Sequence, residues 1–161
     1  MSYAACCAMT KRLKMHRRNF LKLILGATTA LLLEPLNALA ALWNKPAFDT
    51  TKIKEASLLL GIHDEIISTD IQIIAPDRAE NGAVVQVEIK SNLANTDAIY
   101  ILVEKNPTPL IAHFVFSTDT EPSLVTRIKM AETSDIKVVV KAGAQFFTRS
   151  KNVIVLENGC G

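Results

Sequence analysis

The feature that most constrains the fold is an alternation of apolar and polar side chains, repeated in short segments from residue 70 onward. It is clearest in "VQVEIK" (85–90) and "TRIKM" (126–130), and a period of two is typical of strands with one buried face. Pro, Gly, Asn, Asp and Ser separate the segments and favour turns. The predicted strands are "DIQIIA" (70–75), "AVVQVEIKS" (83–91), "AIYILVE" (98–104), "LIAHFVFST" (110–118), "LVTRIKM" (124–130), "IKVVVKA" (136–142), "QFFTRS" (145–150) and "NVIVLE" (152–157).

Seven or eight short strands joined by turns predict an all-β fold, an immunoglobulin-like antiparallel β-sandwich, with a small barrel as the alternative. The turn segments are "ENG" (80–82), "ANTD" (94–97) and "KAGA" (141–144). The stretch "KNPTPL" (105–110) is expected in a loop or at a sheet edge, because its two prolines cannot donate to a central ladder. Apolar surface beside it is a candidate docking site for a partner.

A short amphipathic helix is predicted ahead of the strands, in "DTTKIKEASLLLGI" (49–62). Asp49 or Thr50 is the candidate N-cap, and Gly61 lies near the expected end. The apolar side chains at helical spacing are Ile53, Ala56, Leu59 and Leu60. We interpret this face as core contact.

The first forty residues have the layout of an export signal and not of a domain. Paired Arg17 and Arg18 precede an apolar run (23–33), and Ala38 and Ala40 follow in A-x-A spacing, so cleavage is predicted after Ala40. The run is shorter than the roughly 20 apolar residues that span a bilayer. "RRNFLK" (17–22) resembles a twin-arginine signal, which predicts a periplasmic protein with no membrane segment in its mature form. A general secretory signal or an uncleaved anchor is the alternative.

Removing residues 1–40 changes the charge and the cysteine count. Six of the 18 Lys and Arg and one of the 16 Asp and Glu lie there, which leaves 12 and 15, a net charge of −3. With this negative net charge, the mature sequence gives no indication of nucleic-acid binding. Cys6 and Cys7 are lost with the signal, so Cys160 is the one mature cysteine and no internal disulfide is expected. The 121 remaining residues suit one domain (41–156) followed by a carboxyl-terminal arm (157–161).

The pattern of polar residues does not indicate an active site or a metal site. His63 and His113 are fifty residues apart, and no HxH, CxxC, P-loop or GxGxxG motif is present. We expect His113 to be a half-buried strand residue and His63 a surface or helix C-terminal residue. The sequence therefore predicts neither a metal site nor a self-sufficient active site.

The segment "NGCG" (158–161) places Cys160 between glycines, which lack a Cβ and adopt most backbone conformations. We predict a mobile arm, formed by Asn158, Gly159 and Gly161 around Cys160, that carries the thiol into a narrow cleft of another protein. The last six residues would extend at most about 20 Å. On the tail alone, an incidental cysteine or an intermolecular disulfide is an equal alternative.

Four stretches together resemble the SoxY family, the sulfur-carrier subunit of periplasmic thiosulfate oxidation. They are "AENGAVVQVEI" (79–89), "NPTPLIAHF" (106–114), "VTRIKMAETSDIKVVVKA" (125–142) and the final "NGCG" (158–161). The resemblance implies that Cys160 is the covalent attachment site for sulfur, with Gly159 and Gly161 as its flanking glycines. The family tail reads G-G-C-G-G, so Asn158 in place of glycine and one glycine fewer imply a shorter, stiffer arm.

The resemblance also implies partners: a SoxZ-like subunit in a heterodimer, a haem enzyme that couples thiosulfate to Cys160, and a hydrolase that releases sulfate. The competing class is a periplasmic β-sandwich interaction module or chaperone that uses edge strands and no covalent chemistry. Cys160→Ser separates the two, because only a carrier loses its function.

Overall fold

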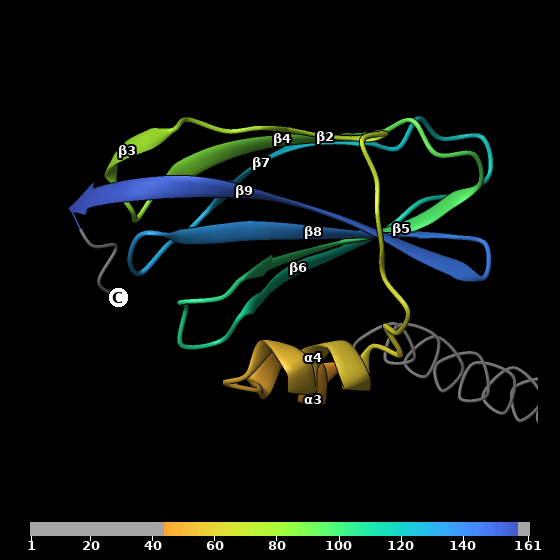
Figure 1. The fold of residues 1–161 in the computed structure, drawn as a ribbon, viewed down its shortest axis with the longest axis horizontal. Helices are drawn as coiled ribbons and strands as arrows, with labels where there is room; N and C mark the ends of the chain where they lie inside the picture. The colour runs from red at the N-terminus through yellow and green to blue at the C-terminus, as the bar shows by residue number, and fades with distance from the viewer. Residues whose placement is uncertain (1–43, 158–161) are drawn as a thin grey trace, which may run out of the picture. The chain divides into compact units, whose positions relative to one another are not determined.

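The computed structural model describes residues 44–157, in which two β-sheets face each other and two short helices cover the outer face of the larger sheet (Figure 1). The predicted signal (1–40) and the segment 158–161 lie outside the described residues. The immunoglobulin-like sandwich predicted from the alternation is confirmed.

The larger sheet has the strand order β1-β9-β8-β5-β6, with β3 also pairing with β9. Its four longer strands form an antiparallel series, since β6 pairs with β5, β5 with β8 and β8 with β9 in opposite directions. The hairpin between β8 and β9 has the two-residue loop Gly143–Ala144, in which Gly143 has a φ of 59° that a tight hairpin needs and glycine adopts readily. The strands are β1 (Ile66–Ile67), β3 (Arg78–Asn81), β5 (Thr96–Val103), β6 (Leu110–Val115), β8 (Ser134–Ala142) and β9 (Gln145–Glu157).

The smaller sheet has the order β2-β4-β7 and is antiparallel throughout. Its strands are β2 (Ile71–Ile74), β4 (Val85–Ser91) and β7 (Ser123–Ile128). Along β4 every second side chain is buried, from Val85 through Val87 to Ile89, as the sequence alternation required. The polar residues between them face solvent on the outer side of the sandwich.

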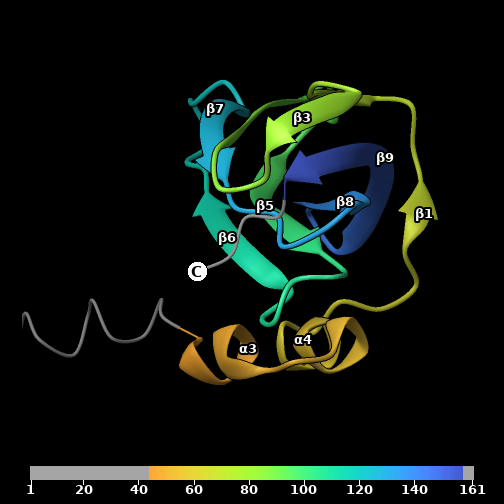
Figure 2. The ribbon, with the colours of Figure 1, turned by 90° about the vertical axis from the view of Figure 1, so that its left-hand side faces the viewer.

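Two pairings depart from the antiparallel prediction. β1 and β3 both run parallel to β9, with Ile66 opposite Phe147 and Arg78 opposite Ile154. Figure 2 views the sandwich from the end at which β9 finishes, where β3 lies beside the last part of β9. These two short strands add to the edge of β9 that does not face β8.

The main core lies between the two sheets and consists almost entirely of β-branched aliphatic side chains, which suit the pleated surface. They come from both sheets and are closed off from solvent: Ile71, Val85, Val87, Ile89, Ile99, Ile101, Val103, Ile136, Val138, Val140 and Val153. Burial of this apolar surface is the main stabilising contribution to the sandwich.

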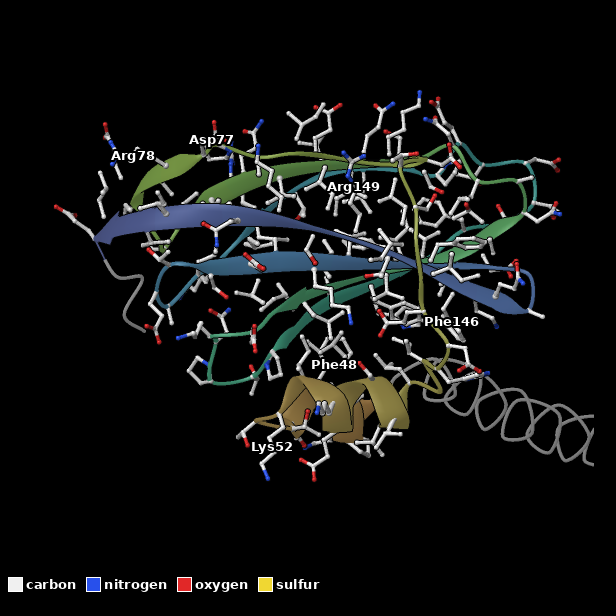
Figure 3. The ribbon with its side chains drawn as sticks, in the orientation of Figure 1. Phe48, Lys52, Asp77, Arg78, Phe146 and Arg149 are labelled. Atoms are coloured by element: carbon white, nitrogen blue, oxygen red, sulfur yellow. The ribbon has the colours of Figure 1, made fainter. Side chains whose placement is uncertain are left out.

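A second, smaller core joins the helices α3 (Lys45–Asp49) and α4 (Ile53–Leu59) to the outer face of the larger sheet. Ala47 and Ala56 are fully buried there, which lets the helices approach the sheet closely. Figure 3 shows Phe48 and Phe146 between the helices and the sheet. An ion pair adds a tether, since Lys137 Nζ on β8 lies 2.7 Å from Glu65 Oε2, just beyond α4.

The helix predicted in residues 49–62 corresponds to α4, and the prediction was right about where it ends and wrong about where it starts. Gly61 has a φ of 69°, and the Gly61 and Ile62 amides donate to the carbonyl oxygens of Leu58 and Ser57, which is a Schellman motif. The N-cap is Lys52, without a side-chain hydrogen bond.

The two residues predicted as N-caps belong to α3 instead. Asp49 is its last residue and Thr50 its C-cap, because Asn44 caps α3 and Pro46 starts a separate turn of helix. Leu59, predicted on the buried face, is exposed.

The stretch 105–110 is confirmed as mostly loop, between β5 and β6. Within the described residues, no helix has the length and apolar character to cross a membrane.

Candidate functional site

The predicted sulfur attachment site, Cys160, and its neighbours Asn158, Gly159 and Gly161 lie outside the described residues, but β9 leads directly to them. β9 ends at Glu157, as the predicted strand 152–157 does, although Glu157 was also counted as the first residue of the predicted arm (157–161). Three residues from Glu157 to Cys160 extend at most about 10 Å.

The end of β9 is fixed on one side by β3 and the turn that follows it. Ile154 N–H donates to Asp77 O at 3.0 Å, and Glu157 lies opposite Asn81. Gly82 N–H then donates to Glu157 O at 2.9 Å, while Gly82 O accepts from Met130 N–H at 2.8 Å. The last residue of β9 is thus connected through Gly82 to the loop between β7 and β8.

On its other side, the end of β9 extends past the start of β8. Ser134, the first residue of β8, lies opposite Val153, so Val155 has no β8 residue opposite it. The hydroxyl of Thr133 replaces that partner. It accepts from Val155 N–H at 2.9 Å and donates to Val155 O at 3.4 Å.

The loops around this end of the sandwich are also joined to one another. The side-chain amide of Asn106 donates to Lys129 O at 2.7 Å and accepts from Ala131 N–H at 2.8 Å. Lys105 N–H donates to the Ser134 hydroxyl at 3.2 Å. The "KNPTPL" loop therefore braces the β7–β8 loop that holds Thr133.

The surface beside the end of β9 combines apolar and charged side chains. Ala79 and Val155 are paired and buried, so Glu80 and Leu156, one residue further along each strand, face outward. Leu156 is 59% exposed. The carboxylate of Asp77 lies 2.9 Å from Lys151 Nζ, and Figure 3 shows Asp77 and Arg78 at this end of the molecule.

Arg149, in the middle of β9, connects the two sheets. Its guanidinium donates to Thr69 O at 3.1 Å and Ile71 O at 2.7 Å, so it satisfies carbonyl groups at the start of β2 (Figure 3). This contact keeps β9 in place beside β2.

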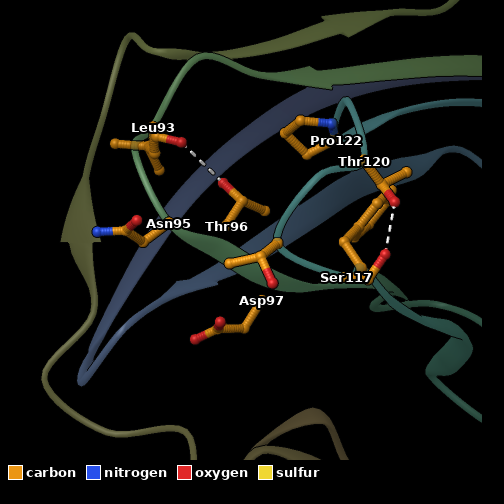
Figure 4. Close-up of a pocket in the computed structure, with 9 residues that line it drawn as sticks. Leu93, Asn95, Thr96, Asp97, Ser117, Thr120 and Pro122 are labelled. Atoms are coloured by element: carbon orange, nitrogen blue, oxygen red, sulfur yellow. Dashed lines mark hydrogen bonds between the residues drawn. The ribbon is translucent and has the colours of Figure 1, made fainter.

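The hollow drawn in Figure 4 lies at the opposite end of β9. It has a volume of about 180 Å³ and includes the side chains of Thr96, Asp97, Ser117 and Thr120. Three of its hydroxyl groups form hydrogen bonds within the domain, since Thr96 donates to Leu93 O at 3.0 Å and the Ser117 and Thr120 hydroxyls are 2.7 Å apart. Thr96 lies opposite Ala142, next to the first residue of β9. The length of β9, about 40 Å, separates this hollow from Glu157, the last residue of the strand.

The two histidines in residues 44–157 are placed as predicted. His113 on β6 is half-buried and stacks on Tyr100, with ring centroids 4.5 Å apart, and burial lowers its pKa. Burial, with a smaller contribution from Asp97, raises the pKa of Tyr100. His63 is exposed, and its Nδ1 lies 2.7 Å from Gly61 O, just past α4. No cluster of three metal-ligating side chains occurs in residues 44–157.

Sequence reasoning missed three residues that hold the end of β9: Gly82, Asn106 and Thr133. The sequence did predict a turn at "ENG" (80–82), which contains Gly82, and a loop at "KNPTPL" (105–110), which contains Asn106. Thr133 carried no signal, because its role depends on β9 extending past β8.

These features define the class of protein: an immunoglobulin-like β-sandwich with a helical cover, whose long last described strand ends three residues before a glycine-flanked cysteine. The family model of the sulfur oxidation protein SoxY matches residues 57–160, more than half of the chain. The chain therefore belongs to the SoxY family.

A solved structure of the same family supports this assignment. The sulfur carrier protein SoxY from Chlorobium limicola f thiosulfatophilum is 33% identical, with a TM-score of 0.59 over 65% of this chain and 96% of that chain. A superoxide reductase (neelaredoxin) from Ignicoccus hospitalis is 14% identical, with a TM-score of 0.45 over 53% of this chain and 79% of that chain, and no conclusion rests on it. The search of curated proteins gave no match.

Proposed function

We propose that this SoxY family member is a periplasmic sulfur carrier that holds thiosulfate-derived sulfur covalently on Cys160 and presents it to partner enzymes. The observation that carries the proposal is that the family match runs through residue 160 and so includes the cysteine. The anchored end of β9 supports it, because the backbone is fixed at Glu157, three residues before Cys160 in the sequence.

The proposed chemistry follows from the resemblance and needs two partner enzymes. In the loading step, the Cys160 thiol and the outer sulfur of thiosulfate form an S–S bond, the thiol proton is released, and two electrons pass to a haem enzyme. In the release step, a hydrolase directs water onto the sulfonate sulfur. The bond between that sulfur and the outer sulfur breaks, sulfate and two protons leave, and a persulfide stays on Cys160.

The carrier itself supplies the attachment atom and a scaffold, and we propose that it acts without a cofactor and without catalysis of its own. A SoxZ-like subunit is its proposed partner in a heterodimer. The Arg17–Arg18 pair supports export by the twin-arginine route, which would allow a folded complex to cross the membrane.

Intact-mass spectrometry without reductant, on protein purified from the periplasm of thiosulfate-grown cells, tests the proposal. We expect sulfur or thiosulfonate adducts that map to the peptide containing Cys160, are removed by reductant and are absent from Cys160→Ser. A bare thiol, or only a disulfide between proteins, would contradict it.

The same variant separates a carrier from an interaction module. Cys160→Ser should abolish thiosulfate turnover while binding to the partner subunit stays unchanged. A chaperone-like module would tolerate the substitution, so unchanged activity of Cys160→Ser would favour that alternative.

A further inference from the structure

The last part of β9 is held from both sides, although β8 no longer lies beside it. Ser134 and Val153 form the last pair between β8 and β9. Four more residues of β9 follow, up to Glu157. An unsupported strand end of this kind would open readily.

The Thr133 hydroxyl holds this end on the β8 side. Its oxygen lies 2.9 Å from Val155 N and 3.4 Å from Val155 O, so one hydroxyl satisfies both backbone groups of Val155. The side chain of Val155 is itself buried in the main core. Thr133 therefore extends the contacts with β9 to the residue just before β8 begins.

The β3 turn holds the other side. Ile154 N–H donates to Asp77 O, and Gly82 N–H donates to Glu157 O. The two sets of contacts alternate along the strand, with Val155 held by Thr133 and its neighbour Ile154 held by β3. Together they keep β9 extended as far as Glu157.

We propose that Thr133 is a positioning residue that sets the pivot of the Cys160 arm at Glu157 and so limits the reach of the thiol. This inference rests on the proposed carrier function. We call the two hydrogen bonds between the Thr133 hydroxyl and Val155 the clamp. While the clamp is intact, Cys160 is three residues beyond the fixed Glu157, which gives a maximum reach of about 10 Å. If β9 separates from Val155 onward, Cys160 is six residues beyond the fixed Ile154, which gives about 20 Å. Every further residue freed must be ordered again when the arm enters a partner, which costs conformational entropy.

Thr133→Val removes the hydroxyl and keeps the shape of the side chain, and Thr133→Ser retains the hydroxyl. The matched control is Thr148→Val, because the Thr148 hydroxyl also donates to a strand carbonyl, Val138 O at 3.1 Å, but in the middle of the β8–β9 ladder. Comparing Thr133→Val with Thr133→Ser and Thr148→Val therefore distinguishes the specific effect of the Thr133 hydroxyl from the general effect of losing a threonine hydrogen bond.

The first readout is amide hydrogen exchange at Val155, Leu156 and Glu157, measured by NMR on the full mature chain. Thr133→Val should speed exchange there about tenfold, in line with the loss of a typical hydrogen bond. Thr133→Ser should restore the slow rate, and Thr148→Val should leave it unchanged. Unchanged exchange in Thr133→Val would overturn the clamp.

The second readout is sulfate release from the thiosulfate-loaded carrier by the hydrolase purified from the same cells. Thr133→Val should raise KM about threefold to tenfold with kcat unchanged, because binding must order a longer arm while the chemistry at the sulfur is the same. Thr133→Ser should behave like the unchanged protein. Faster exchange with an unchanged KM would overturn the positioning role.

The two hypotheses fail in different ways. If the protein without substitutions shows no sulfur adduct on Cys160, the proposed carrier function is wrong. The proposed effect of Thr133 on the reach of the thiol then fails as well. The exchange measurement uses no sulfur chemistry, so it decides the clamp in either case.

Discussion

At the scale of single residues, we expect burial of His113, which stacks on Tyr100, to make the stability of the domain depend on pH. The two rings lie opposite each other on β5 and β6 at an interplanar angle of 15°. Burial lowers the pKa of His113, so the folded chain resists protonation that the unfolded chain accepts near pH 6.5.

The sign of the effect on stability follows from this difference. As pH falls through about 6.5, the unfolded state binds a proton first, so the free energy of unfolding decreases until the lowered pKa of folded His113 is also passed. His113→Gln should flatten the pH dependence of the urea midpoint between about pH 7.5 and 5.5. Tyr100→Phe is the control, because it keeps the ring over His113. A pH dependence that is the same in His113→Gln would refute the assignment.

At the scale of elements, the helical cover depends on small residues that face the sheet. Ala56 in α4 is fully buried beside the second core, whereas Leu58, two residues later, is 75% exposed. Ala56→Leu should lower the free energy of unfolding by about 1–3 kcal/mol, because the added atoms have no space between α4 and the sheet. Leu58→Ser should change it by less than about 0.5 kcal/mol. Urea denaturation measures both, and equal effects would show that α4 does not pack as described.

The strands were predictable where a single strand carries its own alternating pattern. β4 and β8 have buried residues at every second position over much of their length, so the sequence located them. β9 was predicted as two strands because Ser150, Lys151 and Asn152 are polar. They remain in the ladder opposite β8, where the Asn152 side chain also donates to Asp135 Oδ1 at 2.6 Å.

The elements that the sequence missed depend on distant partners. β3 contains Arg78, Glu80 and Asn81, a polar stretch with turn character, and it is a strand because Ile154 and Val155 lie beside it. β1 has only two residues, both exposed, and is defined by its pairing with β9. Local patterns do not contain information on such pairings. α3 has five residues, fewer than a periodic pattern needs.

At the scale of the whole molecule, the candidate site was predicted from a motif and the fold from periodicity, and the two predictions were independent. Cys160 was singled out because glycines flank it, without reference to any strand. The structure adds what the motif lacks: β9 ends at Glu157, and the contacts of Gly82 and Thr133 fix that end. Those contacts join residues 22 to 75 positions apart, so no local pattern indicates them.

The order of the strands bears on how the chain would be exported. β9 pairs with β8, β1 and β3, so the larger sheet is complete only after the last described strand has been made. The twin-arginine route, proposed from the Arg17–Arg18 pair, carries folded proteins and would suit such a chain. We therefore expect folding, and pairing with a SoxZ-like subunit, to precede export.

Replacing both Arg17 and Arg18 with Lys keeps the charge and removes the paired guanidinium groups, so it tests the route directly. We expect the full-length precursor to accumulate in the cytoplasm and the mature chain, starting at Ala41, to disappear from the periplasm. Arg12→Lys is the matched control, since it makes the same exchange outside the pair and should leave export intact. Fractionation with intact-mass spectrometry measures both species. Normal export of the double variant would indicate a general secretory signal.

Deleting residues 1–40 tests whether the partner subunit is exported together with this chain. Continued export of the partner subunit after this deletion would exclude co-transport.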